Sequence, residues 1–150
     1  MLGMENGRIP DSSITALSSY NSHQHFPHFG RLNNQPAFGH IGVWAPIVSQ
    51  KGEYKQVDLG RVTWITHVAT QGRPGFPQWV TEYTVEYSLT GDQWQSYQDG
   101  NGVVFPGNSD HTTVVKNEFS PVIKARYVRI VVQAWHGYIH MRAELYGCEA

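Results

Sequence analysis

The chain has 150 residues, a formal net charge of −1 at pH 7 and one cysteine. Charged residues make up 15% of it, against roughly 25% in an average soluble domain, so the surface must be built largely from uncharged polar residues. The small net charge argues against a protein that follows nucleic-acid phosphates, and we expect no nucleic-acid partner. No apolar run approaches the roughly 20 residues that cross a bilayer. The length fits one domain, residues 1–150, and the composition favours an extracellular β protein.

Residues 18–49 form a long stretch without sustained alternation of apolar and polar positions. The stretch holds Phe26, Phe29, Phe38 and Trp44, and has Gly or Pro at five positions from residue 27 to residue 42. A long irregular segment inside a compact domain is usually functional, because loops carry binding residues on a rigid scaffold. We therefore expect this stretch to supply binding loops.

Strand-like alternation begins after this stretch. In residues 54–60, YKQVDLG, Val57 and Leu59 fall on one face, and Gln56 and Asp58 fall on the other. The same period of two recurs in residues 79–88 (WVTEYTVEYS), 126–133 (RYVRIVVQ) and 139–147 (IHMRAELYG). Turn signals separate these runs, for example GRPGFPQ at residues 72–78 and LTGDQW at residues 89–94. Many short strands joined by Gly/Pro turns predict a β-sandwich or barrel.

Taken in order, several segments resemble one known family. They are LGMENGRIPDSSITA (residues 2–16), EYKQVDLG (53–60), THVATQGR (66–73), VFPGNSD (104–110), FSPVIKARYVRIVV (119–132) and WHGYIHMRAELYGC (135–148). Together they are similar to discoidin domains, the coagulation factor five/eight type C family. The resemblance implies an all-β, distorted jelly-roll sandwich or barrel of about eight main antiparallel strands. It also implies an extracellular or cell-surface setting, no catalysis, and ligand binding by protruding loops, called spikes, at one end.

By position, the resemblance places three spikes at residues 19–30, 42–50 and 73–79, with a neighbouring loop at residues 101–111. Arg73 begins the third spike, where it either pairs with Glu82 to brace the loop or meets an anionic ligand. Trp44 either supports the second spike from the core or contacts the ligand. The expected ligand-binding residues are Tyr20, His25, Phe26, His28, Phe29, Trp44, Arg73, Phe76, Gln78 and Trp79.

Three ligand classes remain open for these loops. Phe26, Phe29 and Phe76 would insert at the headgroup boundary of an anionic phospholipid surface, which makes a peripheral membrane contact possible. A cell-surface glycan would instead stack on an aromatic ring such as Tyr20, as in a lectin. The third class is an extracellular protein of the collagen or receptor type, bound by a cell-adhesion domain with an aromatic anchor.

The sequence supports a metal site less well than it supports the three ligand classes above. His23, His25 and His28 are close in sequence, with His40 further on, but no Cys or carboxylate lies between residues 23 and 40 to complete a zinc site. The family resemblance also implies that some sugar-binding members, the galactose-type lectins, hold a structural calcium near the first long loop. Glu144 matches their carboxylate, whereas Asn33 stands where an Asp would be expected. We expect no cofactor, with Asn33 and Glu144 as the weak calcium candidates.

Catalysis is not expected. The chain has no G-x-S-x-G turn, no P-loop and no G-x-G-x-x-G motif. The carboxylates on the predicted strands have structural partners instead. Arg126, Arg129 and Arg142 are predicted to pair with Asp58, Glu86 or Glu144.

Cys148 matches the last cysteine of the family, which usually joins the first and last strands by a disulfide. The first cysteine would lie just upstream of Leu2. Either the partner precedes this sequence, or this member lives without the bridge.

Overall fold

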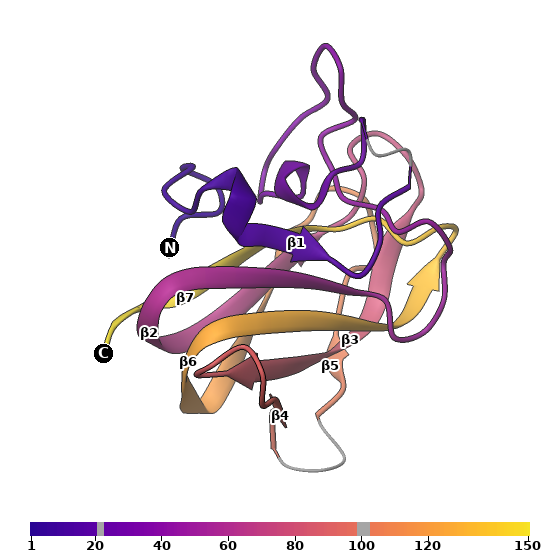
Figure 1. Ribbon diagram of the computed structural model, residues 1–150. Coiled ribbons are helices and arrows are strands. Elements are labelled where there is room, and N and C mark those ends of the chain that lie inside the picture. Colours follow the sequence, from indigo (N-terminus) through magenta and orange to yellow (C-terminus); the bar gives the residue numbers. More distant parts are fainter. Residues whose placement is uncertain (21–22, 99–102) are drawn as a thin grey trace.

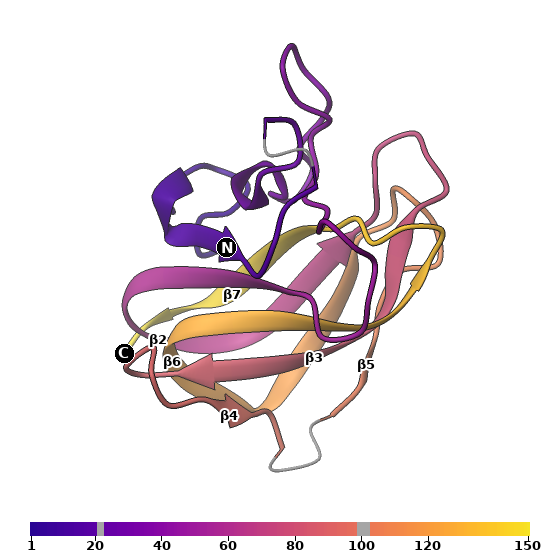
Figure 2. The same cartoon turned by 45° about the vertical axis from the view of Figure 1, so that its right-hand side comes forward.

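Two long antiparallel strands form the frame of the molecule (Figure 1). The computed structural model describes residues 1–20, 23–98 and 103–150. Strand β2 (Tyr54–Gln71) pairs with β6 (Val115–His136), and the register breaks between Asp58 and Thr63. The chain bends at this break, where Gly60 has a φ of +80° that favours glycine. The two halves of each long strand therefore lie in different layers (Figure 2).

Shorter strands complete the layers. β1 (Ile14–Ala16) pairs with the first half of β2, and β7 (Arg142–Glu149) pairs with its second half. β3 (Trp79–Ser88) pairs with β6, and both β4 (Gln95–Ser96) and β5 (Phe105–Pro106) pair with β3. Two 3-10 turns, η1 (Asp11–Ser13) and η2 (Pro27–Phe29), flank β1 in sequence.

The predicted all-β jelly-roll is confirmed. The described residues contain seven strands, and every strand pairing is antiparallel. The number is slightly below the expected eight because β2 and β6 each run through a bend as one continuous strand.

The period-two alternation correctly located the core. Most residues on these apolar faces of β2, β3 and β6 have almost no exposed surface: Val57, Tyr83, Val85, Val128, Ile130 and Val132. Leu59 and Tyr87, on the same faces, are half-buried at the edge of the core. Each such side chain contributes roughly 1.5–3 kcal/mol by leaving water. The closing strand departs from the pattern. Arg142 and Glu144 face away from the core side chains of β7, yet they are buried too, as is His140 just before the strand, because loops cover that face.

The predicted arginine pairings are confirmed in two of three cases. Arg126 Nε donates to Asp58 Oδ1 at 2.9 Å, and Arg129 lies 3.8 Å from the Glu86 carboxylate. The prediction for Arg142 is wrong, because its guanidinium donates to backbone carbonyls rather than to a carboxylate.

The loops between β1 and β2 gather at the top of Figure 1, beside the loop that precedes β3, while both termini lie on the left. Within the described residues, no helix is long and apolar enough to cross a membrane.

Candidate functional site

Arg142 fixes the loop end of the molecule. This buried side chain donates to the carbonyl oxygens of Gly72 at 2.8 Å, Asn34 at 2.9 Å and His111 at 2.8 Å. These carbonyls belong to three different loops. One guanidinium at the start of β7 therefore holds the loops in fixed positions, as a preformed binding site requires.

A cavity of about 350 Å³ opens beside these loops. Its volume lies within the range of about 300–1,000 Å³ that small-molecule sites occupy. The lining residues come from the first spike, the third spike and the turn before β7, together with Ile41, which precedes the second spike. They are Tyr20, Gln24, His25, Ile41, Arg73, Gln78, Tyr138 and His140.

His25 and His140 are the buried members of this lining. Burial is the main cause that lowers the pKa of His140 to about 4, so its imidazole is neutral at physiological pH. His140 Nδ1 lies 3.1 Å from the Tyr138 carbonyl oxygen. A carbonyl only accepts hydrogen bonds, so Nδ1 carries the proton and Nε2 has the free lone pair. Tyr20 packs edge-on against His25, with ring centroids 5.2 Å apart.

The third spike supplies the cationic wall of the pocket. The Arg73 N–H donates to the Gln78 carbonyl oxygen at 3.0 Å, and Gly75 turns the chain with a φ of +78°. Arg73 Nη1 donates to Gln78 Oε1 at 2.8 Å, and its guanidinium carbon lies 3.8 Å from the centre of the Phe76 ring. Of the two predicted roles for Arg73, bracing by Glu82 is wrong, since Gln78 takes that place.

The most exposed apolar side chain of the described residues, Phe38, lies on a loop between the first and second predicted spikes. Ala37 and His40 exchange both backbone hydrogen bonds, which closes a hairpin turn over Phe38 and Gly39. Phe38 is fully exposed, with 106% of its reference surface accessible. Ile47 and Val48 on the second spike are exposed as well. Pro36 and Gly39, which flank Phe38, are typical turn residues and could have indicated this exposed hairpin.

Several predicted contact residues have structural positions instead. Trp44 has 0% exposed surface, and its Nε1 donates to the Ser18 carbonyl oxygen at 2.9 Å, so the core role is correct and the ligand-contact role is wrong. Phe26 and Phe29 are half-buried and are not free loop tips, because they pack in a cluster of rings with His28 and His40. Trp79 is also half-buried, stacked on His136 with centroids 4.6 Å apart.

The pocket brings together four predicted residues, namely Tyr20, His25, Arg73 and Gln78. Phe76 lies at its edge, about half exposed, against the Arg73 guanidinium. The sequence missed Gln24, Ile41, Tyr138 and His140. Alternation placed His140 on a strand face, whereas residues 137–140 form a turn that precedes β7.

The weak calcium candidates already have partners. Glu144 Oε2 accepts from the Glu5 N–H at 2.8 Å, and its Oε1 accepts from the N–H groups of Met4 and Leu145, each at 3.0 Å. Asn33 Nδ2 donates to the Glu5 carboxylate. Within residues 1–20, 23–98 and 103–150, no group of three His, Cys, Asp or Glu side chains is placed to hold a metal ion.

The neighbouring loop predicted at residues 101–111 is interrupted by a short strand. Residues 101 and 102 lie outside the described residues, and Phe105–Pro106 form β5. His111 does adjoin the third spike, since its Nδ1 accepts from the Gly75 N–H at 3.2 Å.

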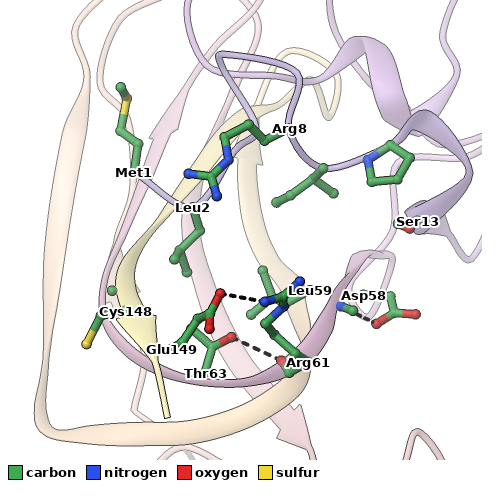
Figure 3. A pocket seen from close by; sticks show the side chains of 14 residues that line it. Met1, Leu2, Arg8, Ser13, Asp58, Leu59, Arg61, Thr63, Cys148 and Glu149 are labelled. Atoms are coloured by element: carbon green, nitrogen blue, oxygen red, sulfur yellow. Dashed lines mark hydrogen bonds and ion pairs between the residues drawn. The ribbon is translucent and has the colours of Figure 1, made fainter.

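A second cavity, of about 400 Å³, lies far from the spikes, between the N-terminal segment and the bend of β2 (Figure 3). Arg61 and Glu149 form an ion pair of 2.6 Å at its rim, and Asp58 is held by Arg126. Leu2 and the exposed free Cys148 also line it. Its carboxylates are thus paired with arginines of the same chain.

Comparison with known proteins gives consistent matches. The family model described as "F5/8 type C domain" matches residues 13–145. The chain is 42% identical to lactadherin of Rattus norvegicus, over 98% of this chain and 36% of lactadherin. It is 39% identical to neuropilin-2 of Homo sapiens, over 98% of this chain and 16% of neuropilin-2. The solved structure of discoidin II from Dictyostelium discoideum superposes with a TM-score of 0.83 at 28% identity, covering 91% of this chain and 55% of that one. The chain thus spans only part of each of these relatives.

Proposed function

Since the chain belongs to the F5/8 type C domain family of binding modules, we propose that it is an extracellular module that binds a sugar of a cell-surface glycan. The observation that carries this proposal is the pocket between the first spike, the third spike and the turn at Tyr138. Apart from the cationic Arg73, its lining mixes aromatic rings with uncharged hydrogen-bonding groups, the combination that a sugar ring requires.

Each part of a sugar would have a partner in this pocket or on Phe76, which packs against the lining residue Arg73. The apolar face of a ring can pack on Tyr20 or Phe76, which are both about half exposed. Sugar hydroxyl groups both donate and accept hydrogen bonds. The neutral His140 offers a lone pair on Nε2, while Gln78 and Arg73 offer N–H donors.

The same lining supports the absence of turnover. None of the described pocket residues is Asp or Glu, so the pocket lacks the two carboxylates that glycoside hydrolysis uses. Nor is any of the described lining residues a Ser, Thr or Cys that a base could activate.

A second candidate function is contact with a membrane surface. It is supported by Phe38, Ile47, Val48 and Phe76, which are exposed apolar side chains on the loops. Exposed apolar tips reduce solubility unless they meet a partner, and a lipid headgroup layer is one such partner.

One experiment separates the two candidates. Wild-type protein and the variants Tyr20→Ala, Gln78→Ala and Phe38→Ser are tested on a glycan array and by flotation with phosphatidylcholine vesicles, with and without phosphatidylserine. For sugar binding, we expect the two pocket variants to weaken capture by about 30-fold, which corresponds to about 2 kcal/mol, and Phe38→Ser to match wild type. Thermal melts check that all variants fold.

The opposite pattern contradicts the sugar proposal. Flotation that is lost in Phe38→Ser, with no glycan retained by wild type, supports the membrane candidate. Absence of both activities, together with capture of an extracellular matrix protein such as collagen, supports the protein-binding alternative. A broad glycosidase screen that finds turnover would overturn the non-catalytic reading.

A further inference from the structure

Arg73 is the fixed positive charge of the pocket. Its guanidinium is positioned by the hydrogen bond to Gln78 Oε1 and by stacking on Phe76. A guanidinium carries five N–H donors, and Gln78 occupies one of them. The side chain is therefore held in place while most of its donors remain available to a ligand.

No acidic side chain that the structure describes balances this charge. Among the residues that the structure describes, the ion pairs are made by other cations, and no carboxylate lies within 4.0 Å of Arg73. Burial is the cause that lowers the pKa of Arg73, which means that the surroundings disfavour its charge. The two fully buried basic groups of the chain are compensated in other ways. Lys55 has Glu144 nearby, and Arg142 donates to three backbone carbonyl oxygens, whereas among the described residues the Arg73 guanidinium donates to Gln78 alone.

The rest of the lining cannot act as a counter-ion. His140 is neutral, Gln78 and Tyr138 are uncharged, and the described lining contains no Asp or Glu. A neutral sugar could use the Arg73 donors but would leave the charge uncompensated, and burial of a charge costs free energy unless a partner compensates it. A bound anion would supply that compensation.

We infer that the sugar bound in this pocket is an acidic one, and that Arg73 binds its carboxylate or sulfate group. This inference rests on the proposed sugar-binding function. The planar guanidinium fork matches the two oxygens of a carboxylate or sulfate, which allows a bidentate contact. Tyr20, Gln78 and Tyr138 then meet the hydroxyl groups and the apolar face of the same ring.

The test uses pairs of sugars that differ only in the acidic group. Binding is measured for methyl glucuronide against methyl glucoside, sialyllactose against lactose, and sulfated against unsulfated galactose. The carboxylate and sulfate arms identify which acid is recognised. We expect the acidic member of at least one pair to bind at least 10-fold more tightly, a difference of about 1.4 kcal/mol.

Two variants assign that preference to Arg73. In Arg73→Gln the acidic and neutral members of a pair bind alike. In Arg73→Lys part of the preference remains, since lysine keeps the charge without the planar fork. Arg61→Gln is the matched control, because it removes the same charge at the far bend of β2 and should keep the full preference (Figure 3).

The outcomes separate the two proposals. If acidic and neutral sugars bind equally, the acidic inference is overturned and the sugar-binding proposal stands. If no sugar of either kind binds, both fail. If the preference survives in Arg73→Gln, or if only phosphatidylserine vesicles are bound, the inference is overturned as well. A loss of folding in Arg73→Gln is recognised by its melting curve, and Arg73→Lys then decides the question.

Discussion

Lys55 places an amino group inside the core, on the same strand as Val57. Its side chain is fully buried, and its Nζ donates to the carbonyl oxygen of Gly30, at the end of the first spike. Burial is the main cause that lowers its pKa to about 7. Arg31 lowers this pKa further, and Glu144 acts in the opposite direction. The folded protein therefore releases a proton that an unfolded chain would keep.

We predict that the free energy of unfolding rises with pH above 7. The unfolded chain holds the Lys55 proton up to its ordinary pKa of 10.5, whereas the folded protein loses it near 7. Between these values the unfolded state binds more protons, so stability gains up to about 1.4 kcal/mol per pH unit from this group. Below pH 7 both states are protonated, and the unfavourable contribution stays constant.

Chemical denaturation from roughly pH 6 to pH 10 measures this dependence in wild type and in Lys55→Met. The variant should show a flatter profile and should gain most, relative to wild type, at the lower pH values. Other groups that titrate in this range are common to both proteins and cancel in the comparison. A difference between the two proteins that does not vary with pH would contradict the lowered pKa.

At the scale of the element, the outer face of β7 carries polar side chains that are buried, whereas the outer face of a closing strand is usually exposed. Glu144 holds the N-terminal segment through the N–H groups of Met4 and Glu5, and Arg142 holds three loops. The Glu144 carboxylate thus has its acceptor capacity satisfied by backbone donors. This arrangement leaves little reason for a calcium ion at the same oxygens.

We predict that neither EDTA nor added calcium changes the melting temperature. Glu144→Gln should lower stability by about 1–3 kcal/mol, because an amide group brings N–H donors to a place that is lined with donors. Glu118→Gln, on the exposed face of β6, serves as the control and should be nearly neutral. A melting temperature that rises on addition of calcium in wild type, and not in Glu144→Gln, would revive the calcium site.

The strands could be predicted from the sequence, whereas most of the pocket could not. Alternation depends on local spacing, so it located Val57, Tyr83 and Ile130 correctly. It also places Lys55 on the same face as Val57, so the alternation indicates that Lys55 is buried as well. The place of His140 in the pocket depends instead on its contact with His25, which lies far away along the chain although the two ring centroids are 6.1 Å apart. Loop contacts of this kind leave no periodic signal in a single sequence.

At the scale of the whole molecule, the two ends of the chain meet away from the spikes (Figure 1). The Leu2 N–H donates to the Leu145 carbonyl oxygen at 2.8 Å, and both Leu2 and Cys148 line the cavity of Figure 3. A residue just upstream of Leu2 would therefore start close to the strand that carries Cys148.

We predict that a cysteine placed just upstream of Leu2, as Met1→Cys preceded by an N-terminal extension, forms a disulfide with Cys148. Such a bridge closes a loop of nearly the whole chain, which stabilises the fold by up to about 4–5 kcal/mol in the entropic model. Thiol titration of the unfolded, unreduced protein should then find no free thiol, and the melting temperature should rise. Reductant should reverse the gain. A bridge that forms without any gain would mean that the native ends are already fixed without it.

The course of β7 also determines how the molecule bears tension. β7 runs from Arg142, which grips the loops, to Glu149, next to the C-terminus, and it pairs along its length with β2. Backbone hydrogen bonds between antiparallel strands lie across the strand direction. A pull between a captured ligand and a tether at the C-terminus thus loads these bonds together, in shear. Under such tension the hydrogen bonds between β7 and β2 share the force and do not break one at a time.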